Sequence, residues 1–497
     1  MSHIPPHSDA PQASRRDFLR RGGALSLGVT LPAWGMNLAA MAASADAAAA
    51  VSNTGDGYKA LVCIFLQGGN DHANTVVPVD ATGHALYARL RGGLATPRAQ
   101  LLPLSPLTSA PAVAGLGTGQ LALSPALPQL ERLFNTERRL AVLLNIGPLR
   151  QPTTLAQFRA RSVALPPKLF SHNDQQSVWQ SHAAEGSTVG WGGVIGDQGL
   201  LLNRAAQATE SLSCVNLAGN TVYPAGQRAG QFMVNALGPD RLLALQPANM
   251  LGSQDCVDAF KALVGTQEPA VHRLAKEHSA IMRRAMDTNA VLLDKLSAIT
   301  EPAERTQPSG NPLADQLRTV ARIMAAHRSL GAAGTAGAGL RRQVFFVSLG
   351  GFDLHDNLSG QHPLLLAQLD AALAQLDADL DVLQMRDQVT AFTASDFGRT
   401  LSSNGDGSDH GWGAHHFVMG GAVQGGRFWG DWPEVTDHDS GAQNIGQGRL
   451  LPTMAVDHLA EALARWMGVT DADALSRIAP HRAAFAANSP LTGLMSG

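Results

Sequence analysis

Residues 60–72 read Ala-Leu-Val-Cys-Ile-Phe-Leu-Gln-Gly-Gly-Asn-Asp-His. The first seven form an unbroken apolar run, which is typical of a strand buried on both faces of a parallel sheet, and the Gly-Gly pair ends it. Similar runs occur at residues 140–144, 344–347, 389–393 and 417–419. The sequence therefore predicts several buried strands, some of which are followed by loops with polar side chains.

Helical patterns lie between these runs. The clearest has one apolar stripe with 4-3-4-3 spacing, formed by Leu369, Leu373, Leu376, Leu380 and Leu383. Strands that alternate with helices predict an α/β protein with a doubly wound, mostly parallel sheet, and the leucine stripe is expected to face that sheet. We expect a single α/β domain over residues 58–490, with a helical insertion at about 270–330.

The composition excludes several classes of protein. Of the 497 residues, 45% are hydrophobic and 15% charged, against about 25% charged in an average soluble domain. A net charge of −3 supplies no field that attracts nucleic acid or anionic lipid, so we expect no nucleic-acid partner. Three cysteines without a CxxC pair exclude a disulfide framework and an iron–sulfur site, and leave at most one bridge, between Cys214 and Cys256.

The first 45 residues have the pattern of an export signal. Residues 14–21 read SRRDFLRR, and an uncharged stretch follows that ends in Ala-Ser-Ala at position 45. A basic region, a modest apolar region and a small-residue end are typical of a signal peptide, and Arg15-Arg16 indicates the twin-arginine pathway. We therefore expect a periplasmic or secreted protein with the twin-arginine export machinery as a partner, a flexible leader over residues 46–57, and no permanent membrane span.

Acidic and imidazole side chains follow three of the predicted strands. Taken singly, an Asp after a strand is usually a turn or helix cap, but the carboxyl ends of strands in an open α/β sheet converge on a crevice. Carboxylates brought together there repel one another, so an Asp-rich crevice implies a cation. Mixed Asp and His ligands suit zinc, manganese or iron better than calcium. The candidate side chains are Asp71 with His72, Asp353 with His355, Asp396, and a further cluster of Asp409, His410, His415 and His416.

A helix start is predicted in residues 169–180, which read Leu-Phe-Ser-His-Asn-Asp-Gln-Gln-Ser-Val-Trp-Gln. Ser171 and Asp174 have the pattern of a capping box with a first-turn acid. A hydroxyl at a helix N-terminus also lies where backbone N–H groups favour an anion, so Ser171 could attack a phosphoryl or sulfuryl group held by a metal. The two interpretations are compatible.

Several long motifs together resemble one family of exported bacterial proteins. They are LQGGNDHANTVVP, LFSHNDQQSVWQS, GWGGVIGD, LGGFDLHDN, TASDFGRTLSSNGDGSDHGWGAHHFVMGG and GGRFWGDWP. With the twin-arginine leader, they identify the chain as a member of the domain of unknown function 1501 family over nearly the whole mature chain. That family is regarded as a branch of the alkaline phosphatase/sulfatase superfamily. The resemblance therefore implies that superfamily's α/β sheet and a one- or two-metal site that hydrolyses phosphate or sulfate esters.

The resemblance also implies roles for particular residues. Asp71 resembles the metal Asp of the first strand, Ser171 the nucleophile, Asp353 with His355 the ligand pair after the middle strand, Asp396 the Asp of an Asp-His pair, and His410 or His415 the last ligand. Asn357 and Phe397 stand where the superfamily usually has histidines, so one imidazole is missing unless His410 substitutes for it. The segment after Ser171 lacks the x-Pro-x-Arg of formylglycine sulfatases, which disfavours that chemistry.

Two functions from different classes follow. The first is an exported hydrolase of small-molecule or polymer phosphate or sulfate esters, with one or two divalent ions, zinc favoured and manganese, magnesium or calcium as alternatives. Ser171 would be its nucleophile or would orient a metal-activated water, and Arg399 would contact an ester oxygen or serve in an ion pair. The second is a relative without turnover that binds a glycan, polymer or protein partner through the same crevice, which Phe397 favours. Only the first predicts metal-dependent turnover.

Overall fold

The computed structural model describes residues 57–108, 119–205, 210–242, 245–264, 272–331, 339–485 and 489–496. The expected signal peptide, residues 1–45, and residues 46–56 of the expected leader lie outside these ranges. Within them, no helix is long and apolar enough to cross a membrane.

A nine-stranded sheet forms the centre of the fold. In spatial order its strands are β13 (Arg427–Trp429), β5 (Leu140–Gly147), β12 (Ala414–Gly420), β9 (Val389–Ser395), β1 (Lys59–Leu66), β8 (Arg342–Leu349), β6 (Cys214–Asn216) and β7 (Gln231–Met233), and β14 (Met454–Ala455) pairs with β5. All pairings are parallel except those of β12 with β5 and β9. The sheet is therefore mostly parallel, as predicted, and β1 lies between β8 and β9.

Two smaller antiparallel sheets accompany it. One pairs β10 (Arg399–Ser403) with β11 (Ser408–His410), and the other joins β2 (Val76–Pro78), β4 (Leu121–Leu123) and β3 (Leu102–Pro103). The β10–β11 hairpin follows directly after β9, and it therefore extends from the carboxyl edge of the large sheet.

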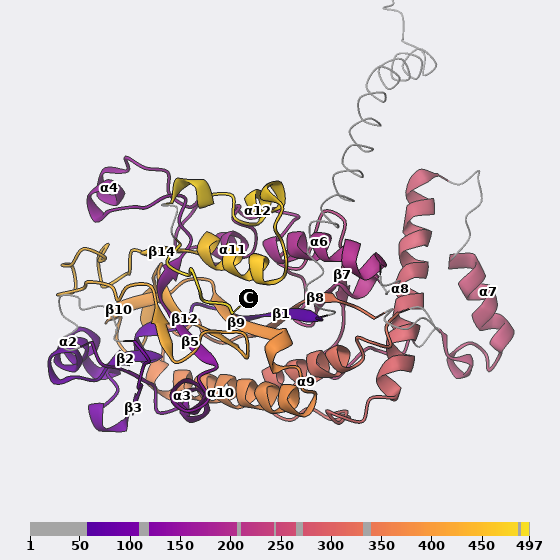
Figure 1. Ribbon diagram of the computed structural model, residues 1–497, viewed down its shortest axis with the longest axis horizontal. Coiled ribbons are helices and arrows are strands. Elements are labelled where there is room, and N and C mark those ends of the chain that lie inside the picture. The colour runs from indigo at the N-terminus through magenta and orange to yellow at the C-terminus, as the bar shows by residue number, and fades with distance from the viewer. Residues whose placement is uncertain are drawn as a thin grey trace, which may run out of the picture. The chain divides into compact units, whose positions relative to one another are not determined.

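Helices cover both faces of the large sheet (Figure 1). On one face lie α3 (Pro128–Asn135), α9 (Pro312–Ala325) and α10 (Leu358–Val382); on the other lie α6 (Trp191–Ala205), α11 (Val456–Trp466) and α12 (Ala472–Ile478). The other α-helices within the described ranges are α2 (Ala81–Arg91), α4 (Leu155–Ala160), α5 (His172–Ser181), α7 (Gln254–Val264) and α8 (Arg273–Ser297). Two helical layers around one sheet confirm the doubly wound α/β class.

The apolar run at residues 60–66 explains why β1 is central. Val62 and Ile64 pack into the core that contains the leucines of α9 and α10, whereas Cys63 and Phe65 pack into the opposite core with α6 and α11. Successive side chains of a strand point to opposite faces, so a strand between two helical layers must be apolar at every position. The other predicted strands are also present, and only residues 417–419 lie in the antiparallel strand, β12.

The helical stretch predicted at about 270–330 contains α8 and α9. Leu313, Leu317 and Val320 of α9 are buried in the core of the sheet. α9 is therefore one of the helices that cover the sheet.

The leucine stripe of α10 faces the sheet, as predicted, with Leu369, Leu373, Leu376 and Leu380 buried and Leu383 packed at the edge of the core.

We expect Leu373→Ala to lower the free energy of unfolding by about 2–5 kcal/mol, because it leaves a cavity in a close-packed core. Denaturant titration measures the change. Leu364 on the same helix is 64% exposed, so Leu364→Ala is the matched control and should change stability by less than about 0.5 kcal/mol. Equal losses of free energy of unfolding in Leu373→Ala and Leu364→Ala would contradict the burial of Leu373 against the sheet.

All three cysteines are free. Cys214 lies in β6 with its sulfur against Gly196 of α6, where even a methyl group at Gly196 would lie 2.2 Å from the sulfur. Cys256 lies in α7. The Cys214–Cys256 bridge that the sequence allowed is not formed, because the Cys214 sulfur is packed between the sheet and α6.

Candidate metal centre

The site is built around the start of α5. Lys168 and Phe170 have φ angles of 40° and 74°, a region that non-glycine residues rarely adopt and that recurs at functional sites. The backbone here brings the carbonyl oxygen of Phe170 to 2.8 Å from Nδ1 of His410. Ser171 is the N-cap, and the helix begins at His172. Residues 170–172 therefore lie against the end of β11.

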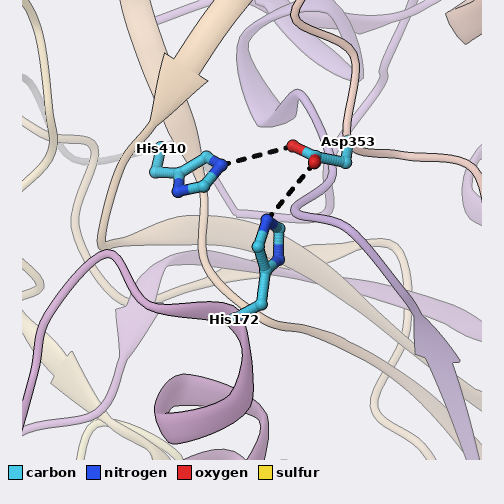
Figure 2. A group of neighbouring side chains, drawn as sticks. All are labelled: His172, Asp353 and His410. Atoms are coloured by element: carbon cyan, nitrogen blue, oxygen red, sulfur yellow. Dashed lines mark hydrogen bonds and ion pairs between the residues drawn. The ribbon is translucent and has the colours of Figure 1, made fainter.

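Three imidazoles converge on the carboxylate of Asp353, which follows β8. Oδ2 of Asp353 lies 3.4 Å from Nε2 of His172, and Oδ1 lies 3.3 Å from Nε2 of His410. Both side chains point toward Asp353 in Figure 2. Oδ1 also lies 3.1 Å from Nε2 of His355, whose Nε2 is 3.0 Å from that of His410. The ligand atoms of His172, Asp353 and His410 all lie within 4.8 Å of one another.

The opposite ring nitrogen of each histidine faces an oxygen atom. These contacts join Nδ1 of His172 to Asp396 Oδ2 at 2.6 Å, Nδ1 of His410 to Phe170 O at 2.8 Å, and Nδ1 of His355 to Asp409 Oδ1 at 3.3 Å. In the tautomer with the proton on Nδ1, each Nε2 has a lone pair directed toward Asp353, as a bound cation requires. Metal-binding histidines are characteristically fixed in this way, with the second nitrogen bound to a carboxylate or a backbone carbonyl.

Asp396 lies directly behind His172 and is fully buried. Its Oδ1 accepts a hydrogen bond from the backbone N–H of Gly68 at 3.1 Å, and its Oδ2 accepts one from Nε2 of Gln176 at 2.9 Å. With His172 also on Oδ2, the carboxylate is occupied by protein donors. The geometry favours a positioning role for Asp396 over the direct ligation expected from the sequence.

We expect Asp396→Asn to weaken metal binding by about 10–100-fold, the usual cost of losing the outer partner of a histidine ligand. The amide keeps the shape of the side chain but removes the charge that holds the proton of His172 on Nδ1. Zinc titration with a competing chelator measures the affinity. Asp370 is a buried carboxylate that instead accepts hydrogen bonds from the first turn of α3, so Asp370→Asn should affect stability but not metal affinity. Equal weakening in both variants would contradict a specific role for Asp396.

The protonation equilibria of two histidines differ. The hydrogen bond to Asp396 raises the pKa of His172 against the effect of partial burial, whereas burial lowers the pKa of His410. His410 is therefore neutral at pH 7 and able to offer its Nε2 lone pair. A proton on Nε2 of His172 would compete with a cation, so metal affinity is expected to fall as the solution is acidified.

Arg399 holds the carboxylate of Asp353 in place. Its buried guanidinium donates to Asp353 Oδ1 at 3.1 Å and to the carbonyl oxygen of Gly68 at 2.9 Å, and its other nitrogens bind Ser408. Desolvation acts to raise the pKa of Asp353, but the hydrogen bond from Arg399 and the nearby His172 lower it overall, so the group is ionised at neutral pH. Of the two roles considered for Arg399, its surroundings fit the ion pair rather than contact with a substrate.

Two of the expected ligands have other partners. Asp71 forms a buried ion pair with Arg91 of α2. His415, in β12, accepts a hydrogen bond from the backbone N–H of Asn145 at 3.1 Å, and burial lowers its pKa to about 3. Of the two histidines left open by the sequence, His410 is the one that contacts Asp353.

Close backbone approach shapes the site. Gly68 has a φ of 114°, and a Cβ there would lie 2.3 Å from the backbone nitrogen of Asp353. The ring of Phe397 packs against His172 and His410, with centroids 4.9 and 4.5 Å apart. Phe397 thus supports the imidazoles. The imidazole beside Asp396 is that of His172, which comes far earlier in the chain.

A cleft of about 440 Å³ opens beside the centre. Gln176, which donates to Asp396, lines it together with Asn173 of the same helix. Amide and hydroxyl side chains dominate its wall, including Gln67, Gln180, Thr188, Asn220 and Thr221, and Glu185 is the one ionisable side chain among its described lining residues. The cleft therefore offers hydrogen bonds with little charge.

Fold and site together define an α/β protein with a His/Asp cluster at the carboxyl edge of a mostly parallel sheet. The chain belongs to the family described as "Protein of unknown function (DUF1501)", whose model matches residues 58–478. No curated protein sequence matches it.

Similar solved structures include Ps i-CgsB in complex with k-i-k-neocarrahexaose, at 9% identity, with 87% of this chain and 77% of that chain covered and a TM-score of 0.35. The C-terminal periplasmic domain of EcEptC from Escherichia coli, in complex with Zn, is similar at 11% identity, 74% and 73% coverage and a TM-score of 0.28. A mutant of the alkaline phosphatase PafA is similar at 12% identity, 69% and 63% coverage and a TM-score of 0.20. At such low scores, what this chain does must be inferred from its own side chains.

Proposed function

We propose that this chain is an exported, metal-dependent hydrolase of phosphate or sulfate esters. The observation that carries the proposal is the convergence of three imidazole Nε2 atoms on the carboxylate of Asp353. This cluster lies beyond the carboxyl ends of β8 and β9, where open α/β sheets bind their ligands.

The donor set fits a divalent transition ion. Two ligands about 2.1 Å from one tetrahedral ion are about 3.4 Å apart. The contacts of His172 and His410 with Asp353 measure 3.4 and 3.3 Å, and the ligand atoms of these three residues all lie within 4.8 Å of one another. Imidazole nitrogens with one carboxylate suit zinc better than calcium or magnesium, which prefer oxygen. An ion bound here would polarise the oxygens of a phosphoryl or sulfuryl group.

The residues around the donors have defined tasks. Asp396, Asp409 and the carbonyl of Phe170 hold the three imidazoles in one tautomer, and Arg399 holds Asp353. Ser171 lies between Phe170 and His172, both of which contact this cluster. Its hydroxyl is the group we assign as nucleophile.

The cleft beside the centre suits the alcohol portion of an ester. Its amides and hydroxyls recognise neutral hydrogen-bonding groups, and without a cationic side chain among its described lining residues it offers no site there for a second anion. We therefore infer a monoester whose remaining part is uncharged and polar.

Metal content and turnover test the proposal together. Protein purified from the periplasm should contain zinc, and the zinc-loaded protein should hydrolyse a generic aryl phosphate or aryl sulfate, with activity lost on chelation and restored by zinc. Turnover that survives complete removal of metal would refute the metal-dependent mechanism. A metal-loaded chain that hydrolyses neither ester would favour the second function, binding without turnover.

That second function is a crevice that binds a glycan, polymer or protein partner without turnover. One observation favours it. Asp71, the expected ligand from the first strand, is neutralised by Arg91, which leaves one His-rich centre rather than two metals.

Export by the twin-arginine pathway is part of the proposal. We expect replacement of both Arg15 and Arg16 by lysine to leave precursor in the cytoplasm, because that pathway reads the arginine pair. Immunoblots of periplasmic and cytoplasmic fractions measure the distribution. Arg20→Lys together with Arg21→Lys keeps the same charge outside the pair and is the matched control. An undiminished amount of periplasmic protein from the variant with Arg15 and Arg16 replaced would refute export by the twin-arginine pathway.

A further inference from the structure

A second cluster of metal-ligating side chains lies at the opposite end of α5. His182 is the C-cap of that helix, Asp457 is in the first turn of α11, and His481 precedes a short 3-10 helix after α12. Nδ1 of His182 lies 3.2 Å from Asp457 Oδ2, and Nδ1 of His481 lies 3.4 Å from Asp457 Oδ1. One ligand atom from each residue lies within 4.8 Å of the other two.

Hydrogen bonds do not fully account for one of these ligand atoms. Nδ1 of His481 is buried without a hydrogen-bond partner among the described residues, although it lies 3.4 Å from Asp457 Oδ1. An unpartnered buried nitrogen is costly, so such a group indicates something further in its surroundings. The two contacts with Asp457 have the length of a tetrahedral edge around zinc, about 3.4 Å.

Asp457 is ready to act as an anionic ligand. It is almost fully buried, and its Oδ1 accepts a hydrogen bond from the backbone N–H of His481 at 2.7 Å. A buried carboxylate that remains charged needs a positive partner.

We propose that His182, Asp457 and His481 bind a structural divalent ion of the zinc class, separate from the centre at Asp353. His182 comes ten residues after His172, so the length of α5 separates the two clusters by about 15 Å. Paired catalytic metals lie about 3.5–4 Å apart, so the second ion is not part of a dinuclear centre.

The location gives this ion a structural role. It would tie the end of α5 to α11 and to the segment after α12. The start of α5 carries His172, so the second ion would also stabilise the helix that presents a ligand to the first centre. It does so whether or not the first centre catalyses a reaction.

Metal counting on the full mature chain tests the proposal. His481 is 25% exposed at its side chain, so His481→Ala should fold, and it should bind one zinc fewer per chain than the wild type under zinc-saturating conditions. His278 is an exposed histidine on α8, and His278→Ala is the matched control, which should bind as much zinc as the wild type. Equal zinc content in His481→Ala and the wild type would overturn the proposal.

A second measurement covers the case in which His481→Ala does not fold. His410→Ala removes a ligand of the first centre and leaves the second intact. After its metal is stripped, this variant should still gain at least about 3 °C in unfolding temperature when zinc is added, because an ion that binds only the folded state stabilises it. If zinc does not raise the unfolding temperature of this variant, the second site is overturned. If zinc does raise it but the wild type binds no zinc at the first centre, that result counts only against the proposed hydrolase.

Discussion

Asp353→Asn is expected to weaken zinc binding at the centre by more than about 100-fold and to reduce ester turnover by a similar factor. Asp353 is the carboxylate that His172, His355 and His410 all contact, and it provides the negative charge that offsets a divalent ion. Loss of a direct ligand should exceed the roughly 10–100-fold cost of losing an outer partner. Zinc competition and initial-rate measurements on the same preparations quantify both effects.

Asp356→Asn is the matched control, because Asp356 lies exposed in the same loop. It should leave affinity and turnover unchanged. The fold should survive Asp353→Asn, since Arg399 keeps its hydrogen bonds to the carbonyl oxygens of Gly68 and Ser408. Unchanged zinc affinity in folded Asp353→Asn would show that the carboxylate is not a ligand and that zinc binds at other residues.

The fold was largely predictable because its pattern is local. Strands with both faces covered must be apolar at every position, which marks residues 60–66 and 344–347 in the sequence. The leucine stripe of α10 marks its buried face in the same way. The direction of β12 was not predictable, because a short apolar run at residues 417–419 reads the same for a parallel or an antiparallel strand.

The site was predictable only where its residues follow strands. Asp353, His355 and Asp396 come directly after β8 and β9, so the topology rule for sheet edges located them. His172 was not among the expected site residues, because it comes from a helix start and meets Asp396 across 224 positions of sequence. A histidine next to a proposed nucleophile, in a chain that lacked one imidazole, was the signal that could have identified it.

Long-range pairing also decided which expected ligands joined the cluster. Asp71 occupies the expected place after β1, but Arg91 at the end of α2 is buried against it. A buried carboxylate is satisfied equally by a guanidinium or by a metal ion, and a sequence pattern does not distinguish the two. The choice between His410 and His415 likewise depended on the turn before α5, which brings the Phe170 carbonyl to His410.

Ser171 lies at the N-cap, as predicted, but the predicted capping box is not formed. No backbone N–H of the helix donates to its side chain. Its hydroxyl instead donates to Asp174 Oδ2, a buried carboxylate that Lys168 also approaches at 3.4 Å. A carboxylate that accepts the proton of a serine hydroxyl is the partner that an activated nucleophile requires. Ser171→Ala therefore tests the role of the hydroxyl as a nucleophile, because the hydroxyl does not cap the helix.

Ser171→Ala is expected to reduce ester turnover by at least about 1,000-fold while zinc stays bound, because the attacking oxygen is removed and the ligands are not. Zinc content, single-turnover rates and the unfolding temperature should be measured on one preparation, and only the rates should change greatly. Ser476 on α12 is an exposed serine whose hydroxyl bonds to a backbone carbonyl, so Ser476→Ala is the control for removal of a helical hydroxyl. Full turnover in Ser171→Ala would exclude the serine as nucleophile and assign attack to a water. Zinc lost together with turnover would instead show that Ser171 positions His172, since both effects would then come from the displaced start of α5.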